Sequence, residues 1–317
     1  MKIVLPGGSG QVGTVLARHF HQRGDKVVVL SRKAEQRLWR VVPWDGCTPG
    51  AWMQEIDGAD VVVNLTGSTI NTRYTPANRK LILNTRLDST RVVGEAIRSA
   101  TRKPKLWMNA SAAGIYPHAR GESFDEFTTR TGADDLSTPE TWRFAADVCK
   151  QWEEVFTAED VPGTRKIALR TTLLLNPNKG SVFDVLIGLV RKGLGGHQGD
   201  GRQCISWMHD ADYVRAIDLL IDDESIAGPV NLCAPAATSN AEFMRELRRA
   251  AGIGIGLPAP EIAIKISAIF MRTEPWLVLK SVNTRPGVLQ TAGFDFQYTD
   301  FGSAARNLVR RWKLNAY

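Results

Sequence analysis

Short apolar runs rich in β-branched residues alternate with helix-length segments through the first half of the chain. Turn-forming residues bound each run, which is typical of strands. Repeated strand–helix–strand units predict an α/β fold with a parallel, doubly wound sheet. The predicted strands span Lys2–Leu5, Lys26–Leu30, Val61–Leu65, Leu106–Ala110 and Lys166–Leu169.

The regular alternation ends near residue 176, where the chain becomes richer in proline and glycine. Pro177 precedes a glycine cluster at 193–201 and a Pro/Gly-rich stretch at 252–260. We therefore expect a larger domain over residues 1–175 and a smaller α+β lobe, mainly over residues 176–317.

Some later segments have the pattern of elements that return to the sheet. These are a helical pattern at Asp210–Leu220, an apolar strand at Pro229–Leu232 and a final helical pattern at Thr299–Trp312. We expect segments over about 210–233 to rejoin the large domain and a final helix over about 299–312.

The composition is that of an ordinary globular protein. The chain has 317 residues, of which 43% are hydrophobic and 23% charged, so it has ample apolar mass for a packed core and is not a disordered or fibrous protein. The net charge of +7 is compatible with anionic ligands. The basic residues are scattered, which indicates a solvated positive surface and no nucleic-acid partner.

Cysteine and histidine spacing predicts no metal site. The four cysteines lie far apart without a CxxC pair, and the five histidines do not complete a ligand set with them. No uncharged apolar stretch reaches about 18 residues, so no membrane span is expected. Free cysteines and the lack of a signal-type h-region favour a reduced, cytoplasmic location.

The first turn of the chain carries a dinucleotide-binding pattern. Residues Gly7-Gly8-Ser9-Gly10-Gln11-Val12-Gly13 follow a predicted strand and open a helical pattern. Gly7 permits the tight turn, Gly10 lets the backbone approach a pyrophosphate, and Gly13 lets helix and strand pack closely. The helix N-terminus then offers N–H donors to the phosphates.

The end of the second predicted strand indicates which dinucleotide binds. An acidic residue there would favour NAD, but the chain reads Ser31-Arg32-Lys33. A hydroxyl and two cations suit the 2′-phosphate of NADP(H), which a carboxylate would repel. Asp45 is either an acceptor for the adenine amino group or a surface turn residue.

Several further motifs resemble those of the extended short-chain dehydrogenase/reductase superfamily, and more narrowly its atypical epimerase-family group. The resemblance covers nearly the whole chain and implies a Rossmann-type NADP-binding domain with a carboxy-terminal substrate lobe. The segments that carry it include the glycine loop, Asn64-Leu65-Thr66-Gly67, Arg86-Leu87-Asp88-Ser89-Thr90, Trp152-Glu153, Gly193-Leu194-Gly195-Gly196, Gly201-Arg202-Gln203, Ser206-Trp207-Met208-His209 and Gly293-Phe294.

The resemblance also implies roles for individual residues at the cofactor. Leu65, Thr66 and Gly67 should border the nicotinamide half, and Leu174 should touch the cofactor. Arg86 stands where related enzymes usually carry an Asn. Each of these roles is implied by similarity alone.

The chain lacks the catalytic pair of that superfamily, a Tyr and a Lys four residues apart on one helix. In one register Ala145 takes the Tyr position and Cys149 the Lys position; in the other these are Ala146 and Lys150. Neither register supplies a phenol, so the ordinary proton transfer cannot run unchanged.

Two hydroxyls near the end of the fourth apolar strand are the candidate replacements. Ser111 ends that strand and Tyr116 follows in the loop, although Tyr116 also suits a loop aromatic that covers the sheet edge. Cys149 is expected to be a small core residue, because it lies in the middle of a helical pattern and a reactive thiolate would need a cation or a helix terminus to lower its pKa.

Arg202 and His209 are the candidate substrate contacts. Related nucleotide-sugar enzymes carry an Arg four residues before the histidine, but Ile205 stands there and the nearest Arg is Arg202. The alternative for Arg202 is a loop charge, and for His209 a helix cap.

Two functional hypotheses remain open at this point. The first is an NADP(H)-dependent oxidoreductase or epimerase acting on an unidentified small hydroxyl, carbonyl or sugar-like substrate. The second is a binding protein without turnover that senses the NADPH/NADP ratio. The missing pair favours the sensor, whereas Ser111 and the substrate lobe favour the enzyme.

Arg32→Ala tests the cofactor preference. We expect the variant to lose about 1.5–3 kcal/mol of NADPH binding, the range for a charge-assisted hydrogen bond, with a much smaller loss for NADH. Fluorescence titration with both dinucleotides measures this difference. Equal losses for NADPH and NADH would contradict the assignment of Arg32 to the 2′-phosphate.

Overall fold

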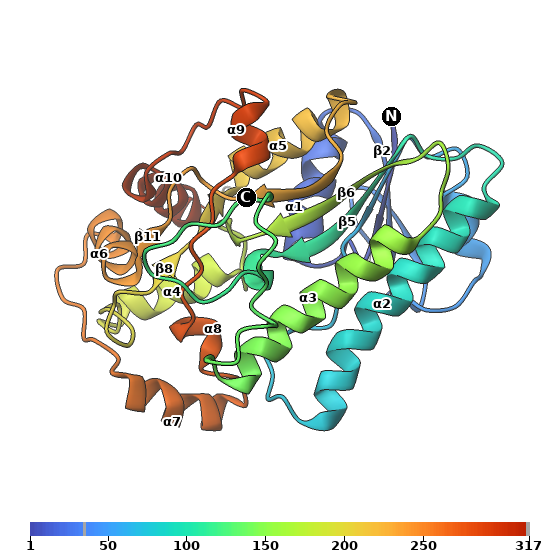
Figure 1. Ribbon diagram of the computed structural model, residues 1–317. Helices are drawn as coiled ribbons and strands as arrows, with labels where there is room; N and C mark the ends of the chain where they lie inside the picture. The colour runs from blue at the N-terminus through green and yellow to red at the C-terminus, as the bar shows by residue number, and fades with distance from the viewer. Residues whose placement is uncertain (34–35, 315–317) are drawn as a thin grey trace.

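A parallel sheet forms the centre of the protein (Figure 1). The computed structural model describes residues 1–33 and 36–314, and within these ranges seven strands pair in the order β3-β2-β1-β4-β5-β6-β10. The order in which strands are added to the sheet reverses at β1, with β2 and β3 on one side of it and β4 on the other. In parallel sheets a binding crevice forms at such a point, at the carboxyl ends of the strands. The strands span β1 Lys2–Pro6, β2 Lys26–Ser31, β3 Arg40–Pro43, β4 Val61–Asn64, β5 Leu106–Ala112, β6 Arg165–Thr171 and β10 Gly228–Leu232.

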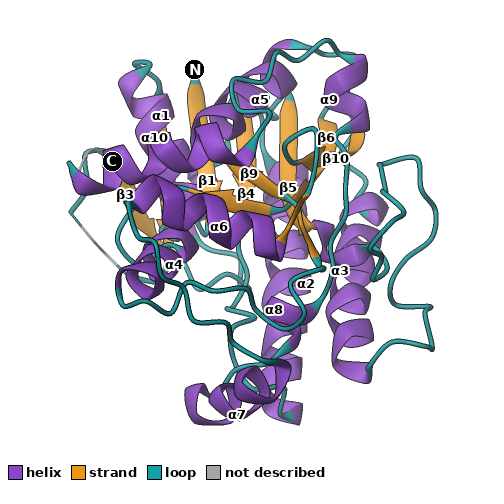
Figure 2. Ribbon diagram, turned by 90° about the vertical axis from the view of Figure 1, so that its left-hand side faces the viewer, coloured by secondary structure: helices purple, strands orange, loops and turns teal. Residues whose placement is uncertain are grey.

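Helices cover both faces of the sheet (Figure 2). On one face, α1 (Gln11–Gln22) and α5 (Asp210–Asp222) pack their apolar sides against the strands. On the other face lie α2 (Pro76–Ser99), α3 (Glu140–Ala158) and the short 3-10 helix η1 (Ala51–Glu55). Both faces of the sheet are buried, which explains why its strands are continuous apolar runs without polar alternation.

A second body of helices lies beyond the carboxyl ends of the strands. Three of its helices share an apolar cluster of their own, separate from the clusters on the sheet. They are α4 (Val182–Arg191), α6 (Asn240–Ala251) and α10 (Phe301–Lys313). The remaining elements are η2 Ala113–Ile115, β7 Leu173–Leu175, β8 Cys204–Ile205, β9 Trp207–His209, β11 Thr238–Ser239, α7 Glu261–Met271, α8 Trp276–Leu279 and α9 Gly287–Thr291.

The predicted fold class is confirmed, and two of the three segments expected at the sheet return to it. Helix α5 packs on the sheet and β10 pairs with β6. Helix α10 is the exception, because its apolar face packs against α6 in the second body. An amphipathic pattern predicts that a helix has a buried face but not which partner covers that face.

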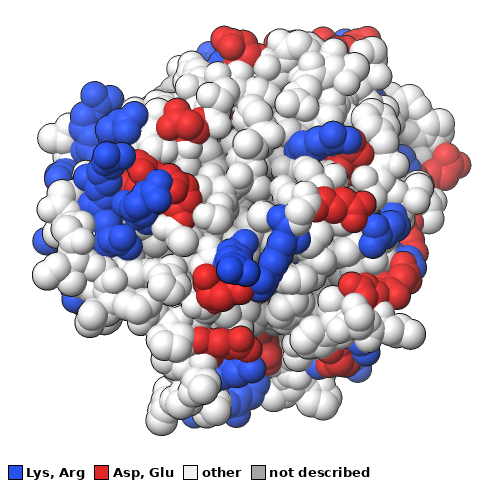
Figure 3. All heavy atoms as spheres, turned by 60° about the vertical axis from the view of Figure 1, so that its left-hand side comes forward, with Lys and Arg blue, Asp and Glu red and all other residues white. Residues whose placement is uncertain are grey.

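On the face shown in Figure 3, one group of Lys and Arg side chains lies at the left edge beside Asp and Glu, and the other basic side chains are scattered among acidic ones. Among the described residues, no helix combines the length and apolar character needed to cross a bilayer. The same part of the chain contains no group of His, Cys, Asp and Glu side chains arranged to hold a metal ion.

A buried ion pair fastens α3 to the sheet. Arg170 on β6 donates from Nε and Nη2 to the two carboxylate oxygens of Glu153 on α3, at 2.9 and 2.7 Å. Ser111 Oγ donates to the same carboxylate at 2.5 Å, and Arg170 Nη1 donates to the hydroxyl of Tyr116 at 2.8 Å. Both charged groups are therefore satisfied in a largely buried position, with the side chains of Arg170 and Glu153 10% and 15% exposed.

Removing one member of this pair should destabilise the protein strongly. We expect Arg170→Met to lower the free energy of unfolding by about 3–5 kcal/mol, because Glu153 would be left as a buried, unpaired charge. Lys150 on the same helix pairs with Asp134 at the surface, at 3.3 Å, and provides the control. Lys150→Met should cost less than about 1 kcal/mol. Urea denaturation compares the two, and equal losses would refute the role of the buried pair.

Candidate functional site

A groove runs along the carboxyl ends of β1, β2 and β4. Its volume is about 420 Å³, and Gly7, Ser9 and Gly10 of the glycine loop line it. Gly7 has φ +71°, and a Cβ there would lie 2.7 Å from the Cα of Thr66. Glycine is therefore required at this turn both for its backbone conformation and for the space.

The glycines at positions 10 and 13 have different surroundings. A Cβ on Gly13 would lie 2.3 Å from the carbonyl oxygen of Gly8, so this glycine sets how closely α1 approaches the loop. A Cβ on Gly10 would meet no protein atom within 4 Å. Gly10 is the N-cap of α1 and no side chain caps the helix there. The N-terminus of a 12-residue helix thus faces the groove with its N–H groups available to an anion.

The end of β2 supplies a hydroxyl and cations, as predicted. Ser31 and Arg32 line the groove, and Ser31 also lines a small adjoining pocket together with Gly8, Lys33 and Arg37. The backbone N–H of Lys33 donates to Ser31 Oγ at 3.2 Å. A hydroxyl and cations thus lie together at this edge of the groove, and these are the groups that bind a phosphate.

Asp45 lines the groove, but its carboxylate also builds the turn that follows β3. It accepts from the backbone N–H groups of Cys47 and Thr48, both at 2.9 Å, and from the Thr48 hydroxyl. These bonds hold the pKa of Asp45 well below its ordinary value. Asp45 therefore shapes the wall of the groove through this turn.

The loop after β4 carries an unsatisfied hydroxyl. Leu65, Thr66 and Gly67 all line the groove, and Thr66 Oγ1 is buried without a hydrogen-bond partner among the described residues. Because buried hydroxyls normally have partners, this atom is suited to a hydroxyl or phosphate oxygen of a bound dinucleotide. Sequence reasoning missed other lining residues, which come from loops and from α2: Trp44, Gly46, Cys47, Ser68, Leu81, Asn84, Thr85 and Asp88.

Gln11, Val12 and Leu174 are among the residues assigned to the cofactor that do not line the groove. Gln11 donates from its side chain to the carbonyl of Lys179, and Val12 packs against the core of the sheet. Leu174 is also in that core, whereas its neighbour Leu173 faces a second cavity. The two leucines differ in this way because successive side chains of a strand point to opposite sides.

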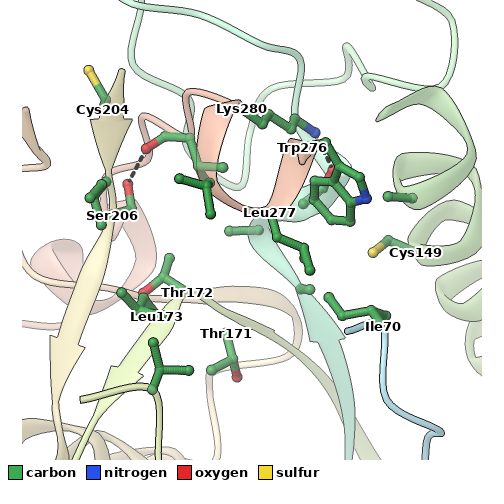
Figure 4. A pocket seen from close by; sticks show the side chains of 18 of the residues that line it. Ile70, Cys149, Thr171, Thr172, Leu173, Cys204, Ser206, Trp276, Leu277 and Lys280 are labelled. Atoms are coloured by element: carbon green, nitrogen blue, oxygen red, sulfur yellow. Dashed lines mark hydrogen bonds between the residues drawn. The ribbon is translucent and has the colours of Figure 1, made fainter. Parts of the chain in front are cut away.

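The second cavity has a volume of about 340 Å³ and lies at the carboxyl ends of β5 and β6. Figure 4 shows Thr171, Thr172 and Leu173 on one side of it and Trp276, Leu277 and Lys280 of the carboxy-terminal segment on another. Most of its lining is aliphatic or aromatic, and none of its described lining residues is acidic. The apolar lining includes Ile70, Ile82, Phe144, Val148, Val182, Leu186, Ile205, Phe243, Met244 and Val282.

Two cations line this apolar cavity. The guanidinium of Arg86 on α2 donates to the carbonyls of Ser68 and Ile82, at 3.2 and 2.8 Å, and stacks over the ring of Trp152. Lys280 is 7% exposed, and its Nζ donates to the carbonyl of Gly114 at 2.9 Å. Burial lowers the pKa of Lys280 to about 8 and also lowers that of Arg86. Arg86 thus belongs to the second cavity, although the resemblance had grouped it with the cofactor contacts.

Ser111 does not reach the cavity, which corrects its assignment as a candidate catalytic residue. Its hydroxyl donates to Glu153, on the α3 side of the sheet, and the next residue, Ala112, lines the cavity instead. Adjacent residues of β5 face opposite sides of the sheet, so the hydroxyl at this position is directed away from a substrate.

Tyr116 is also withdrawn from the cavity. Its hydroxyl lies 2.9 Å from both the carbonyl of Asp125 and the side-chain oxygen of Asn231, and it accepts from Arg170. Burial raises the pKa of Tyr116 to about 12. The hydroxyl is fully used in holding the loop, as the alternative interpretation of a loop aromatic expected.

The structure decides between the two registers of α3. Ala145 and Cys149 line the cavity, whereas Ala146 and Lys150 do not. Burial raises the pKa of Cys149 to about 11, so its thiol is protonated near neutral pH. The positions that face the cavity thus carry a methyl group and a neutral thiol.

Arg202 and His209 lie outside both cavities, contrary to their assignment to the substrate. Arg202 is exposed. His209 is the N-cap of α5, with Nδ1 accepting from the N–H of Ala211 at 3.0 Å, and its ring stacks on Tyr298. Burial lowers the pKa of His209, which suits a neutral acceptor in that cap.

The chain matches two family models. Residues 3–233 match the NAD dependent epimerase/dehydratase family, and residues 259–308 match a domain of unknown function, DUF1731. The chain is 29% identical over 308 residues to Epimerase family protein MW0731 of Staphylococcus aureus, covering 97% of this chain and 98% of the relative. It is 30% identical to Epimerase family protein SH2119 of Staphylococcus haemolyticus, with 97% and 99% coverage.

The fold also resembles that of a solved human protein. The crystal structure of human epimerase family protein SDR39U1 (isoform2) with NADPH superposes with a TM-score of 0.85 at 24% identity. The match covers 98% of this chain and 99% of the human one. The whole architecture described above is therefore shared, including the carboxy-terminal segment.

Gly10→Val tests the groove with a matched control at Gly13. The side chain at position 10 would enter open space, so we expect the variant to remain folded and to lose NADPH binding at the helix N-terminus. Gly13→Val places its Cβ against backbone and should lower the melting temperature instead. Thermal unfolding and NADPH titration separate the two effects. Wild-type NADPH affinity in folded Gly10→Val would refute the placement.

Proposed function

The chain belongs to the NAD dependent epimerase/dehydratase family, and from this premise we propose that it is an NADP(H)-dependent oxidoreductase acting on an apolar substrate with a carbonyl or hydroxyl group. The observation that carries the proposal is the apolar cavity at the carboxyl ends of β5 and β6, next to the dinucleotide groove.

The groove supports NADP(H) as the cofactor. The glycine loop and the N-terminus of α1 would hold the pyrophosphate, and Thr66 Oγ1 would gain a partner. Ser31, Arg32 and Lys33 would bind the 2′-phosphate. The human SDR39U1 protein was crystallised with NADPH, which agrees with these residues.

The lining of the cavity supports an apolar substrate over a nucleotide sugar. A diphosphate needs several cations or N–H donors along its length. The cavity has Arg86 and Lys280 among mainly apolar side chains. Ile205, which stands where related nucleotide-sugar enzymes carry an Arg, also lines it. A small apolar carbonyl compound would leave fewer polar groups unpaired there than a sugar would.

Bound NADPH would supply a hydride, and the residues of the chain would position its acceptor. The strand ends at Ala112 and Thr171 form one wall of the cavity, and α8 forms another. Trp276 and Leu277 of α8 would shield a bound substrate from water, which strengthens polar interactions within the site.

A carbonyl screen tests the proposed function. We expect NADPH oxidation, followed by absorbance, with apolar probes such as benzaldehyde, cyclohexanone and 1,4-naphthoquinone, and no oxidation with UDP-glucose. Ile205→Arg should reduce turnover of the apolar probes by at least about tenfold, because it introduces a charge into the cavity. Tight NADPH binding without oxidation of any carbonyl probe would instead favour the alternative of a cofactor sensor.

A further inference from the structure

Tyr74 has a buried hydroxyl whose proton has no acceptor among the described residues. The residue precedes α2, its side chain lines the second cavity and it is 7% exposed. Its ring packs edge-on against Phe144, with centroids 5.0 Å apart, and lies near the ring of Trp276. The ring is therefore held firmly, while the hydroxyl proton points to no acceptor within the described part of the chain.

Trp276 has a second buried donor in the same cavity. Its indole N–H lies close to the hydroxyl oxygen of Tyr74 and interacts with it weakly, which lowers the pKa of Tyr74. The proton of the Tyr74 hydroxyl still has no acceptor among the described residues. A buried donor without an acceptor costs free energy, so this proton indicates that a bound molecule supplies the acceptor. An acceptor on an otherwise apolar molecule matches the substrate class proposed above.

Arg86 gives this part of the cavity a positive charge. Its guanidinium donates to backbone carbonyls and stacks on Trp152, and no described lining residue supplies a carboxylate. Burial raises the pKa of Tyr74, and the carboxylate of Glu274, which accepts from the Tyr74 backbone N–H at 2.7 Å, raises it further. The Trp276 contact and the charge of Arg86 oppose that rise in pKa. Near neutral pH the phenol is therefore protonated, and a phenolate formed there would be stabilised by the guanidinium.

We propose that Tyr74 is the catalytic residue that protonates the substrate oxygen, with Arg86 as the positioning residue that stabilises the resulting phenolate. This inference rests on the proposed function and assigns the proton donor of that site. In the direction of reduction, a C–H bond forms at the carbonyl carbon with the hydride from NADPH. The π electrons of the carbonyl move to its oxygen, which takes the proton of Tyr74, and water reprotonates the phenolate.

The hydroxyls expected from the sequence are less suited to this step. Ser111 and Tyr116 are directed away from the cavity, and both have partners. Lys280 lines the cavity with Nζ bound to the carbonyl of Gly114 and is the competing donor, so loss of turnover in Tyr74→Phe distinguishes the two. Tyr74 also lies beside Ala145, with which it shares an apolar cluster, so its ring reaches the part of α3 where the helix carries only a methyl group.

Tyr74→Phe removes the hydroxyl and keeps the ring, and Tyr213→Phe is the matched control. Tyr213 is fully buried on α5, outside the cavity, and its hydroxyl has only a 3.5 Å contact with Thr171. With the best carbonyl probe, Tyr74→Phe should lower kcat about 10²–10⁴-fold, as expected for loss of a general acid. NADPH affinity and melting temperature should stay at wild-type values, and Tyr213→Phe should retain wild-type kcat.

Arg86 requires a test that separates charge from packing. Arg86→Gln should lower kcat at least tenfold, and Arg86→Lys should recover part of that loss because it restores the charge. A purely structural role predicts instead that melting temperature falls while kcat of the remaining folded protein is unchanged. That result would overturn the assignment of Arg86.

Benzoate provides a readout that does not depend on turnover. Its ring suits the apolar cavity, and its carboxylate would accept from Tyr74 and Trp276. Calorimetric titration into the NADP⁺ complex should show binding to the wild type and at least tenfold weaker binding to Tyr74→Phe. Absence of benzoate binding to the wild type, or equal affinity for both proteins, would overturn the donor site. Benzoate binding that depends on Tyr74, without reduction of any carbonyl probe, would overturn the proposed function and the proton-transfer step but leave the donor site standing.

Discussion

The buried pair between Arg170 and Glu153 is the interaction on which the arrangement of the site depends. It joins the carboxyl end of β6 to the middle of α3, and it draws in the hydroxyls of Ser111 and Tyr116. Because the two charges satisfy each other with good geometry, α3 is held in one rotation about its axis. That rotation directs Ala145 and Cys149 toward the cavity.

The same network explains why neither Ser111 nor Tyr116 offers a hydroxyl to the cavity. Ser111 on β5 bonds to α3, and Tyr116 holds the loop that follows β5, so these hydroxyls are not available to a substrate. The cavity obtains its donors from elsewhere: Tyr74 and Arg86 come from the region between β4 and the middle of α2, and Trp276 comes from α8. Donors outnumber acceptors among these side chains, which makes the cavity complementary to an oxygen acceptor on an apolar molecule.

The carboxy-terminal segment completes the cavity because several bonds attach it to the large domain. Lys280 donates to Gly114, Ser281 donates to the carbonyl of Ala119, and Arg285 forms an ion pair with Asp125 at 2.6 Å. All three bonds reach the region that follows β5, beside the cavity. The segment is thereby a fixed wall of the site, and α8 is held across the strand ends.

The sequence by itself determined the parallel sheet, the glycine loop and the cations at the end of β2, because each depends on residues close together in the chain. Strand periodicity and turn chemistry are local, and Gly7, Gly10 and Gly13 act within a single loop. Only the tertiary structure decided between the two registers of α3, directed the Ser111 hydroxyl to Glu153 and placed Leu174 in the core. It also brought Tyr74 beside Trp276, since a cavity between distant segments depends on long-range packing that local patterns do not specify.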